Sequence, residues 1–296
     1  MLGILSPSLW IVSGMKQQKS EDDLSIVIVS YNTKELLRAR LKTLQGAIIV
    51  VDNASGDGSY EMVKKEFPNV DLIKNQQNVG FARANNQGIQ RTKSKYVLLL
   101  NTDCEATHQA ITETLKFFET HPEVGGISCK LVLPDGSIDP ACHRGFPTPW
   151  ASLTYFIGLE KLFRSSILFG QYHQGYKPMG EIHDVDCISG AFFLVRREVI
   201  EHVGLLDEAF FMYGEDIDWC FRIRKAGYKI QFYPHVSVVH KKHQSGLAHA
   251  DSQLRFNTQK YFYDAMKLFY NKHYRYRYNP IVSAFVLMGI KLRSLL

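Results

Sequence analysis

The first half of the chain alternates short apolar runs with segments of helical character. Such runs occupy residues 25–30, 47–52, 70–74 and 96–100. A continuous apolar run is typical of a strand buried on both faces, and strands that alternate with helices through short connections form a parallel sheet. The sequence therefore predicts an α/β fold with a doubly wound, mostly parallel sheet flanked by helices.

The second half of the chain is less regular. The pattern predicts helices over 109–120, 197–203 and 217–225, and strands over 125–133, 185–195 and 237–240. Between them, residues 134–183 are rich in Gly, His and aromatic side chains and read as a long irregular excursion. Loops of that length in a compact domain are often lids or binding loops.

The basic charge of the protein is concentrated at its C-terminal end. The chain has 296 residues and a formal net charge of +6, yet from Arg255 onward eight Lys and Arg residues face one acid, Asp264. Residues 255–278 also interleave nine aromatic side chains with six basic ones. This composition suits an anionic membrane surface, and it equally suits a C-terminal helix packed on the main domain. Nothing else in the sequence indicates nucleic-acid binding.

These features divide the chain into three parts. We expect a disordered N-terminal extension over 1–24, a catalytic α/β domain over 25–250, and a basic aromatic helical region over 251–296. The five cysteines are scattered and lack CxxC spacing, which favours a reducing compartment over a disulfide framework or zinc site. No segment reaches the roughly 20 apolar residues that a membrane-spanning helix requires.

Two acids follow apolar runs where strands of an open α/β sheet end. Asp52 ends one run, and Asp103 closes Leu100-Asn-Thr-Asp103 after another. Ligands bind at this edge of such sheets, so Asp103 is a candidate for holding a divalent cation and Asp52 for contacting a nucleotide base. The alternatives are a helix cap at Asp103 and a simple turn at Asp52.

Three further patterns carry candidate chemistry. Gly80 and Arg83 stand where a helix is expected to start, and the N-terminus of a helix favours an anion such as phosphate. The alternative is that Arg83 is a solvated surface side chain. Glu215 and Asp216 could supply a general base, or could complement the dipole of the helix that follows. His240 ends an apolar run, where a histidine is more often structural than a ligand.

Taken in order, these segments resemble the family-2 inverting glycosyltransferases of the GT-A fold, and most closely their bacterial rhamnosyltransferase-like branch. The motifs that carry the resemblance are Ser25–Asn32, Val51–Ser59, Asn78–Asn85, Leu100–Asp103, Ser189–Ala191, Tyr213–Asp216 and Val239-His240. Together they cover about residues 25–275.

The resemblance implies a role for each motif. It implies Asp216 as the catalytic base with Glu215 beside it, and Asp103 and His240 as ligands of Mg²⁺ or Mn²⁺. Asn101 replaces the first acid of the family's Asp-X-Asp motif. The residues implied to bind the nucleotide-sugar are Ser30, Tyr31, Asn32, Asp52, Asn53, Asp57, Gly80, Arg83, Asn85, Asn101, Thr102, Ser189 and Gly190.

The implied reaction is a single displacement with inversion. The donor would be a dTDP- or UDP-linked sugar, and the resemblance to the rhamnosyltransferase-like branch implies rhamnose or another deoxyhexose. The acceptor would be a hydroxyl of a lipid-linked or polysaccharide glycan, and the enzyme would attach peripherally to the cytoplasmic face of the cell membrane.

Other functions fit the sequence less well. A sugar-phosphate nucleotidyltransferase needs a Gly-rich basic loop after the first strand, where this chain has Ser-Tyr-Asn-Thr, and a dehydrogenase needs G-x-G-x-x-G there. A membrane-associated glycan- or nucleotide-sugar-binding protein with weak or no catalysis is the remaining alternative, against which Asp103 and Asp216 argue together.

Overall fold

The first half of the chain folds as four parallel strands with helices between them. The computed structural model describes residues 23–242 and 252–295. Each strand expected in this half is present, and a helix lies between each pair of successive strands. The elements are β1 (Leu24–Ser30), α2 (Lys34–Leu41), β2 (Ala47–Asp52), α3 (Ser59–Glu66), β3 (Asp71–Lys74), α4 (Phe81–Arg91) and β4 (Tyr96–Leu100).

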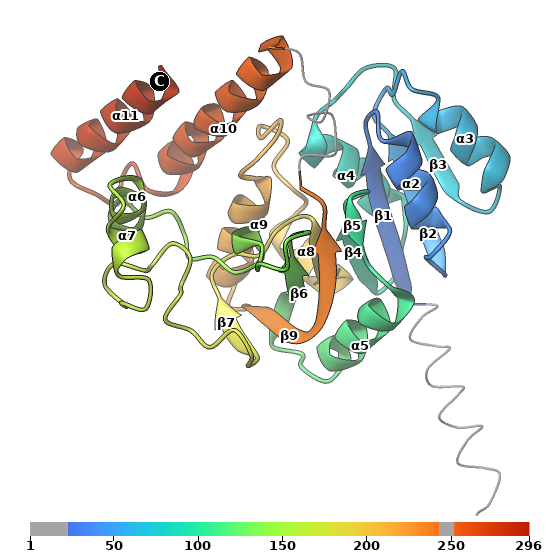
Figure 1. The fold of residues 1–296 in the computed structure, drawn as a ribbon, viewed down its shortest axis with the longest axis horizontal. Coiled ribbons are helices and arrows are strands. Elements are labelled where there is room, and N and C mark those ends of the chain that lie inside the picture. The colour runs from blue at the N-terminus through green and yellow to red at the C-terminus, as the bar shows by residue number, and fades with distance from the viewer. Residues whose placement is uncertain (1–22, 243–251, 296) are drawn as a thin grey trace, which may run out of the picture.

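The second half completes one mixed sheet at the centre of the molecule (Figure 1). Its elements are β5 (Cys104–Glu105), α5 (His108–Glu119), β6 (Val124–Val132), β7 (His183–Val185), β8 (Phe192–Arg196), α8 (Arg197–Val203), α9 (Glu215–Lys225) and β9 (Lys229–His240). The strand order is β3-β2-β1-β4-β8-β6-β9-β5, with β7 also paired to β9. The sheet is mixed and not mostly parallel: β8 runs antiparallel to β4 and β6, and β5 and β7 run antiparallel to β9, whereas the other four pairings are parallel.

Two strand predictions in this half are wrong in extent. Residues 185–195 were expected to be one regular segment, yet β7 and β8 are separate strands that pair with different neighbours, and residues 186–191 connect them. β9 begins eight residues before the expected Ser237. Its pairing with β6 is irregular between Tyr233 and Ser237, where Pro234 lacks the N–H of a regular ladder.

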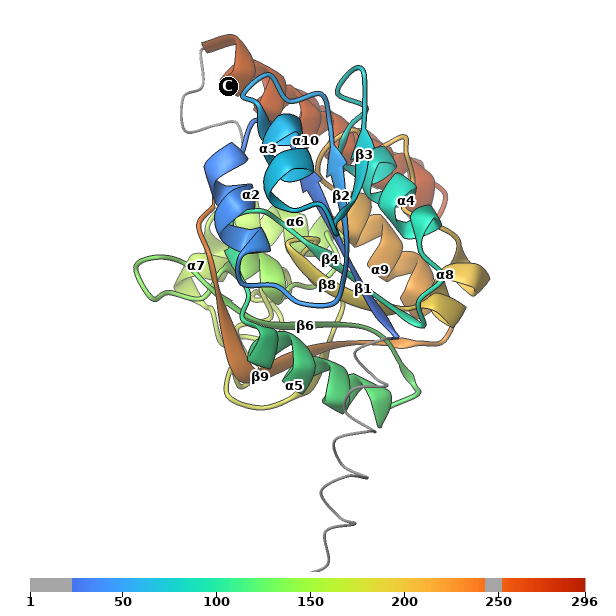
Figure 2. The same cartoon turned by 90° about the vertical axis from the view of Figure 1, so that its right-hand side faces the viewer.

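Helices cover both faces of the sheet. Right-handed crossovers from β1 to β2 and from β2 to β3 place α2 and α3 on one face, and the return from β3 to β4 places α4 on the other. Figure 2 shows this separation, with α8 and α9 on the same side as α4. The contact of α4 with β1 is close, because a Cβ on Gly88 would lie 2.3 Å from Val27 Cγ1.

The excursion after β6 contains more helix than expected. It holds the 3₁₀ turn η1 (Pro140–Cys142) and the short helices α6 (Pro149–Phe156) and α7 (Leu159–Leu162). At the start of α6 the Thr148 side chain accepts a hydrogen bond from the Ala151 N–H, and Pro149 occupies the first helical position. Both are favourable helix-start signals that the sequence carried.

The C-terminal region forms two helices, α10 (Ser252–His273) and α11 (Pro280–Ser294), that lie side by side (Figure 1). Phe269, Tyr270 and Tyr274 are buried in a second apolar cluster with Phe210 and Phe221, so the aromatic side chains of the tail do pack on the main domain. None of the described helices combines the length and the apolar character needed to cross a membrane.

The expected segment boundaries are tested only in part by this fold. Leu24 already belongs to β1, so the strand begins one residue before the expected domain start. Residues 1–22 and 243–251 lie outside the described part of the chain, so the disorder expected at the N-terminus and the boundary near residue 250 stay predictions.

A buried carboxylate joins α10 to α9. Asp218 has no exposed side-chain surface and accepts hydrogen bonds from Arg222, Lys272 and His273 at 2.7–2.8 Å. Burial alone would raise the pKa of Asp218, but these three partners lower it to about 2. Asp218 therefore helps to fix the position of α10, together with the aromatic cluster and the Lys272–Asp207 ion pair.

We expect Asp218→Asn to destabilise the protein by about 3–5 kcal/mol, because it removes the buried carboxylate that Arg222 and Lys272 both contact. The pKa of Asp218 in the folded state lies below its ordinary value of 3.8. The stabilisation that the Asp218 carboxylate gives the wild-type protein is therefore complete above pH 4 and is lost as the pH falls towards 2. Urea denaturation at pH 7 and at lower pH should therefore show the two proteins converging on acidification.

Asp264→Asn is the matched control, because Asp264 also lies on α10 but pairs with Lys260 at 59% side-chain exposure. Exposed pairs contribute under about 1 kcal/mol. Equal losses in the two variants would contradict the anchoring role of Asp218.

Candidate functional site

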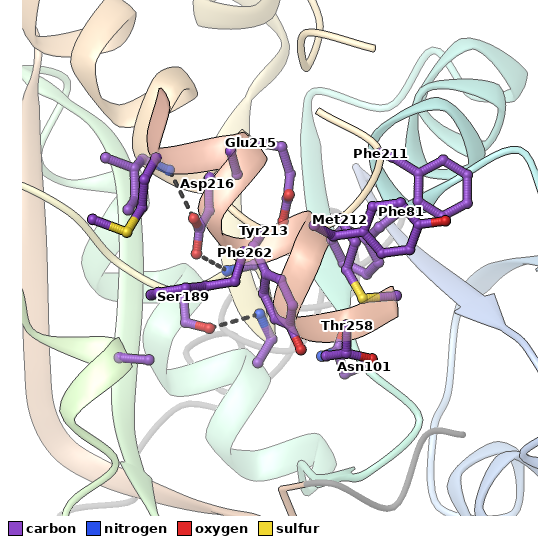
Figure 3. Close-up of a pocket in the computed structure, with 18 of the residues that line it drawn as sticks. Phe81, Asn101, Ser189, Phe211, Met212, Tyr213, Glu215, Asp216, Thr258 and Phe262 are labelled. Atoms are coloured by element: carbon purple, nitrogen blue, oxygen red, sulfur yellow. Dashed lines mark hydrogen bonds between the residues drawn. The ribbon is translucent and has the colours of Figure 1, made fainter. Parts of the chain in front are cut away.

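A cavity of about 760 Å³ opens at the edge of the sheet where β1, β2 and β4 end. The sheet edge forms its floor, the start of α9 and residues 189–191 form one wall, and α6 and α10 close the other. Figure 3 shows part of this lining. The predicted site residues that line the cavity are Tyr31, Asn53, Asn101, Thr102, Asp103, Ser189, Gly190, Glu215, Asp216 and His240.

Strand pairing brings Asp103 and His240 together, although 137 positions separate them. β5 pairs antiparallel with the end of β9, so that Cys104 stands opposite His240. His240 Nε2 lies 3.4 Å from Asp103 Oδ1, which is an ion-pair contact and not a good hydrogen bond. Asp103 Oδ1 is buried and has no hydrogen-bond partner among the described residues.

A second carboxylate holds the other side of the His240 ring. Asp139, which the sequence did not single out, lies with Oδ2 at 2.6 Å from His240 Nδ1 and with Oδ1 at 2.6 Å from Lys242 Nζ. Burial alone would raise the pKa of Asp139, but its hydrogen bonds to His240 and Lys242 hold it well below the usual range. Burial alone would lower the pKa of His240, and the two carboxylates raise it to about 9.

These groups fit a divalent cation. Ligand atoms of Asp103, Cys104 and His240 lie within 4.8 Å of one another, and all three residues are buried. Burial raises the pKa of the Cys104 thiol well above its usual value, so the carboxylate and the imidazole are the better donors. An imidazole whose other nitrogen bonds to a carboxylate is the common arrangement for a metal-binding histidine, and the unpartnered Asp103 oxygen faces the same space.

Asp216 sits at the first turn of α9 with both carboxylate oxygens engaged. Arg144 donates to Oδ2 at 2.8 Å and the Gly190 N–H donates to the same oxygen at 3.3 Å. The Ile217 N–H donates to Oδ1 at 2.8 Å. Three donors therefore fix the orientation of the carboxylate, while 13% of its side-chain surface stays exposed towards the cavity.

Glu215, the neighbouring acid, has a different environment. Its side chain is buried, and Oε2 has no hydrogen-bond partner among the residues that the structure describes. Burial, and then the charge of Asp216, raise the pKa of Glu215 to about 8. The environment of Glu215 therefore favours its protonated form.

Arg144 is a site residue that the sequence analysis missed. It lies in the excursion after β6, with 12% of its side chain exposed, and it also donates to the Ala141 and Ile188 carbonyls. The excursion was expected to hold functional loops, but no spacing signal distinguishes this arginine, because its partner is 72 residues away.

The proposed base-binding residue Asp52 lies beneath the cavity. It is 1% exposed, and Oδ2 accepts a hydrogen bond from the Ser55 N–H, whereas Oδ1 has no partner among the described residues. Burial raises the pKa of Asp52. Its strand neighbour Ser30 bonds Thr33 through the two hydroxyl groups and, like Asp52, does not line the cavity.

Asn32 and Asp57 join the loops after β1 and β2. Asn32 adopts a φ of 54° and accepts a hydrogen bond from the Gly56 N–H at 2.7 Å, and Asp57 accepts from the Lys34 N–H at 2.8 Å. Neither residue lines the cavity. Their contacts fix the loop that carries Asn53, which does line it.

The two α4 side chains expected to contact phosphate, Arg83 and Asn85, do not line the cavity. Arg83 is 58% exposed on the outer surface, 3.7 Å from Glu208, and Asn85 is buried and donates to the Phe81 carbonyl. Neither lines the cavity, because the turn of the helix directs Phe81 towards it instead. Gly80 precedes the helix with a φ of +88°, and a Cβ there would lie 2.7 Å from the Phe211 carbonyl oxygen.

Aromatic side chains form the wall opposite the sheet edge. Tyr155 and Phe156 come from α6, and Tyr261 and Phe262 from α10. The Tyr261 ring packs against Phe211, with 4.7 Å between the ring centroids. The C-terminal region is therefore part of the cavity, which the sequence analysis did not predict.

The known proteins to which this chain is similar in sequence include several glycosyltransferases. The chain is 29% identical over 232 residues to the low-salt glycan biosynthesis hexosyltransferase Agl10 of Haloferax volcanii, covering 76% of this chain and 69% of that protein. It is 28% identical over 243 residues to the N-acetylglucosaminyl-diphospho-decaprenol L-rhamnosyltransferase of Mycobacterium tuberculosis, covering 76% and 78%. It is 25% identical over 252 residues to rhamnosyltransferase WbbL of Escherichia coli, covering 80% and 90%.

Solved structures share the fold at lower identity. The mannosyltransferase PcManGT from Pyrobaculum calidifontis, solved with GDP-Man and Mn²⁺, matches with a TM-score of 0.54 and 16% identity over 88% of this chain and 70% of that one. TarS of S. aureus matches with a TM-score of 0.53 and 14% identity over 83% and 38%. These likenesses identify the sheet and its helices as a GT-A fold. Residues 25–204 match the description "Glycosyl transferase family 2", and the chain therefore belongs to that family of glycosyltransferases.

Proposed function

We propose that this protein transfers a sugar from a nucleoside-diphosphate sugar to a hydroxyl group of a lipid-linked or polysaccharide acceptor, with inversion at the anomeric carbon. The observation that carries the proposal is the presence, in one cavity, of an oriented carboxylate at Asp216 and of the Asp103–His240 pair. The first would act on the acceptor and the second on the diphosphate of the donor.

In this proposal Asp216 removes the proton from the acceptor hydroxyl as the oxygen attacks the anomeric carbon. Arg144 and the Gly190 N–H hold the carboxylate in place, so little reorientation is needed before proton transfer. Glu215, in the protonated form that its environment favours, adds no second negative charge beside it. A single base without a second nucleophile suits one displacement step and hence inversion.

The donor would lie along the sheet edge. The Oδ1 atom of Asp52 is buried and has no partner among the described residues; exposed to the cavity by a side-chain movement, it would accept a hydrogen bond from the ring N–H of a pyrimidine base, which favours a dTDP- or UDP-linked donor. Asp103 and His240 would hold Mg²⁺ or Mn²⁺, which when bound neutralises charge on the leaving diphosphate. The rhamnosyltransferase relatives support rhamnose or another deoxyhexose as the sugar.

We further propose that the protein works at the cytoplasmic face of the cell membrane as a peripheral protein. The name of the Mycobacterium tuberculosis relative specifies an acceptor carried on decaprenol, a membrane lipid. The excess of basic residues at the C-terminal end of this chain suits the anionic surface on which such an acceptor would be found.

The donor can be identified by ligand stabilisation. We expect dTDP- or UDP-linked sugars to raise the Tm of the protein in the presence of Mn²⁺, because a ligand at one hundred times its Kd stabilises the folded state by about 2.7 kcal/mol. A panel that includes GDP- and ADP-linked sugars provides the comparison. Stabilisation by purine donors alone would contradict the proposed role of Asp52.

We expect Asp216→Asn to lower the transfer rate by about 10²–10⁴-fold, because the amide cannot accept the proton of the acceptor hydroxyl. Donor binding, measured by calorimetric titration, should persist, since the change leaves the nucleotide contacts in place. Asp71→Asn, which removes an exposed partner of Arg91, is the control and should retain full activity. Turnover at the wild-type level in Asp216→Asn would eliminate Asp216 as the base.

We expect Asp103→Ala to abolish the thermal stabilisation that Mn²⁺ gives to the nucleotide complex, because it removes the one carboxylate of the candidate ligand group. The adjacent Cys104→Ala is the control, since its thiol is protonated and should contribute little to binding the ion. Differential scanning calorimetry with UDP or dTDP, with and without Mn²⁺, makes the measurement. Unchanged Mn²⁺ dependence in Asp103→Ala would refute the metal assignment.

A further inference from the structure

Large apolar side chains are exposed on one end of the described molecule. Apart from Tyr213 at the cavity, every large hydrophobic residue with high exposure in the described parts lies in residues 150–168 or 262–295. We define the apolar end surface by the most exposed members of this set on or beside α6, α7 and α11, leaving out Trp150, Tyr155 and Val282, which are 37–44% exposed. They are Leu153, Ile157, Leu162, Phe163, Ile167, Leu168, Ile281, Phe285, Met288, Leu292 and Leu295, at 49–75% exposure.

α11 presents a continuous apolar stripe to this surface. Ile281, Phe285, Met288 and Leu292 recur at intervals of four, three and four residues, which places them on one face of the helix. The opposite face packs inward, where Ser283 is 7% exposed and accepts a hydrogen bond from the Tyr270 hydroxyl at 2.9 Å. The helix is therefore anchored to α10 on one side and has no cover among the described residues on the other.

The two parts of the surface touch each other beside the cavity. Arg293 of α11 donates to the Phe156 carbonyl of α6 at 2.9 Å, and its guanidinium lies 5.1 Å from the centre of the Phe156 ring. Phe156 and its neighbour Tyr155 also line the cavity. Figure 1 shows α6, α7 and α11 grouped at the end of the molecule opposite α3. The apolar end surface thus borders the entrance through which an acceptor would reach Asp216.

The charges around this surface have one sign. The cations in and beside it, all exposed, are Lys161, Arg164, Arg275, Arg277, Lys291 and Arg293. The only acid in residues 150–168 and 275–295 is Glu160, which is 5% exposed and accepts a hydrogen bond from the His173 N–H. Exposed apolar groups ringed by cations match the acyl chains and the anionic headgroups of a lipid bilayer.

We propose that the apolar end surface docks this protein on an anionic lipid bilayer, with α11 lying in the plane of the interface. A second copy of the chain fits less well, because self-association through this surface would bring two rings of like charge together. The inference rests on the proposed function, since it supplies the orientation in which a lipid-linked acceptor meets the cavity. It is tested by lipid binding, which needs no turnover.

The experiment measures co-sedimentation of the full chain with vesicles of phosphatidylglycerol and phosphatidylcholine in equal parts, and with vesicles of phosphatidylcholine alone. The test variant is Phe285→Glu with Met288→Glu. Both side chains are more than half exposed, at 64% and 51%, so the Tm should be unchanged. We expect binding to the anionic vesicles to fall by about tenfold or more, because two charges replace apolar groups that enter the interface.

The control variant is Lys64→Gln with Lys65→Gln on α3, at the other end of the molecule. It lowers the net charge by the same two units and should bind the vesicles nearly as well as wild type. Equal losses in the two variants would show that overall charge alone drives binding and would overturn the proposal. So would wild-type protein that does not sediment with vesicles, or a dimer that the test variant converts to monomer without any loss of lipid binding.

Nucleotide-sugar stabilisation separates this inference from the proposed function. If the wild-type protein binds a donor with Mn²⁺ but does not sediment with vesicles, the proposal of a docking surface is wrong and the transferase proposal stands. If vesicles bind and no donor does, the transferase proposal fails by itself.

Discussion

The antiparallel strand β8 is the constraint on which the site depends. Its register with β4 sets Leu100 opposite Phe192, so the chain entering β8 lies beside the chain leaving β4. The hydrogen bond from the Asn101 N–H to the Ala191 carbonyl, at 3.0 Å, extends this pairing past the ends of both strands. Gly190 is thereby held where its N–H reaches Asp216. A parallel strand at this position would begin at the opposite edge of the sheet, and the base would lose this donor.

The C-terminal helices complete the cavity that the sheet begins. α10 contributes Tyr261 and Phe262 to its wall, and the Asp218 network and the aromatic cluster around Phe269 hold α10 against α9. Asp216 and Asp218 stand two positions apart on α9, one engaged by Arg144 and the other by α10. The same turn of helix therefore orients the proposed base and secures the wall opposite to it. A change in the packing of α10 against Asp218 should therefore also alter the position of Asp216.

Much of the fold follows from local patterns, whereas the site follows from them only in part. The strands up to β4, and the acids that follow β2 and β4, were predictable because burial and strand ends leave a local signature at Asp52 and Asp103. Arg144 and Asp139 were not, because their partners Asp216 and His240 lie 72 and 101 positions away. The antiparallel direction of β8 could not be predicted from the sequence either, because an apolar run does not show in which direction the strand pairs. Arg83 and Asn85 do not line the cavity, because a helix start fixes neither the rotation of the helix nor which of its side chains faces the cavity.

The pairing of β5 with β9 offers an explanation for Asn101, which stands where the family's motif has its first acid. That pairing delivers His240 to Asp103, and Asp139 holds the far side of the imidazole ring. The ring already stands between two carboxylates, so a third acid at position 101 would add negative charge to a buried cluster at a desolvation cost. The Asn101 side chain can line the cavity and offer hydrogen bonds without that cost. In the proposed metal site, His240 takes the place of the missing carboxylate as the second protein ligand. The site then carries one negative charge fewer than it would with an acid at position 101.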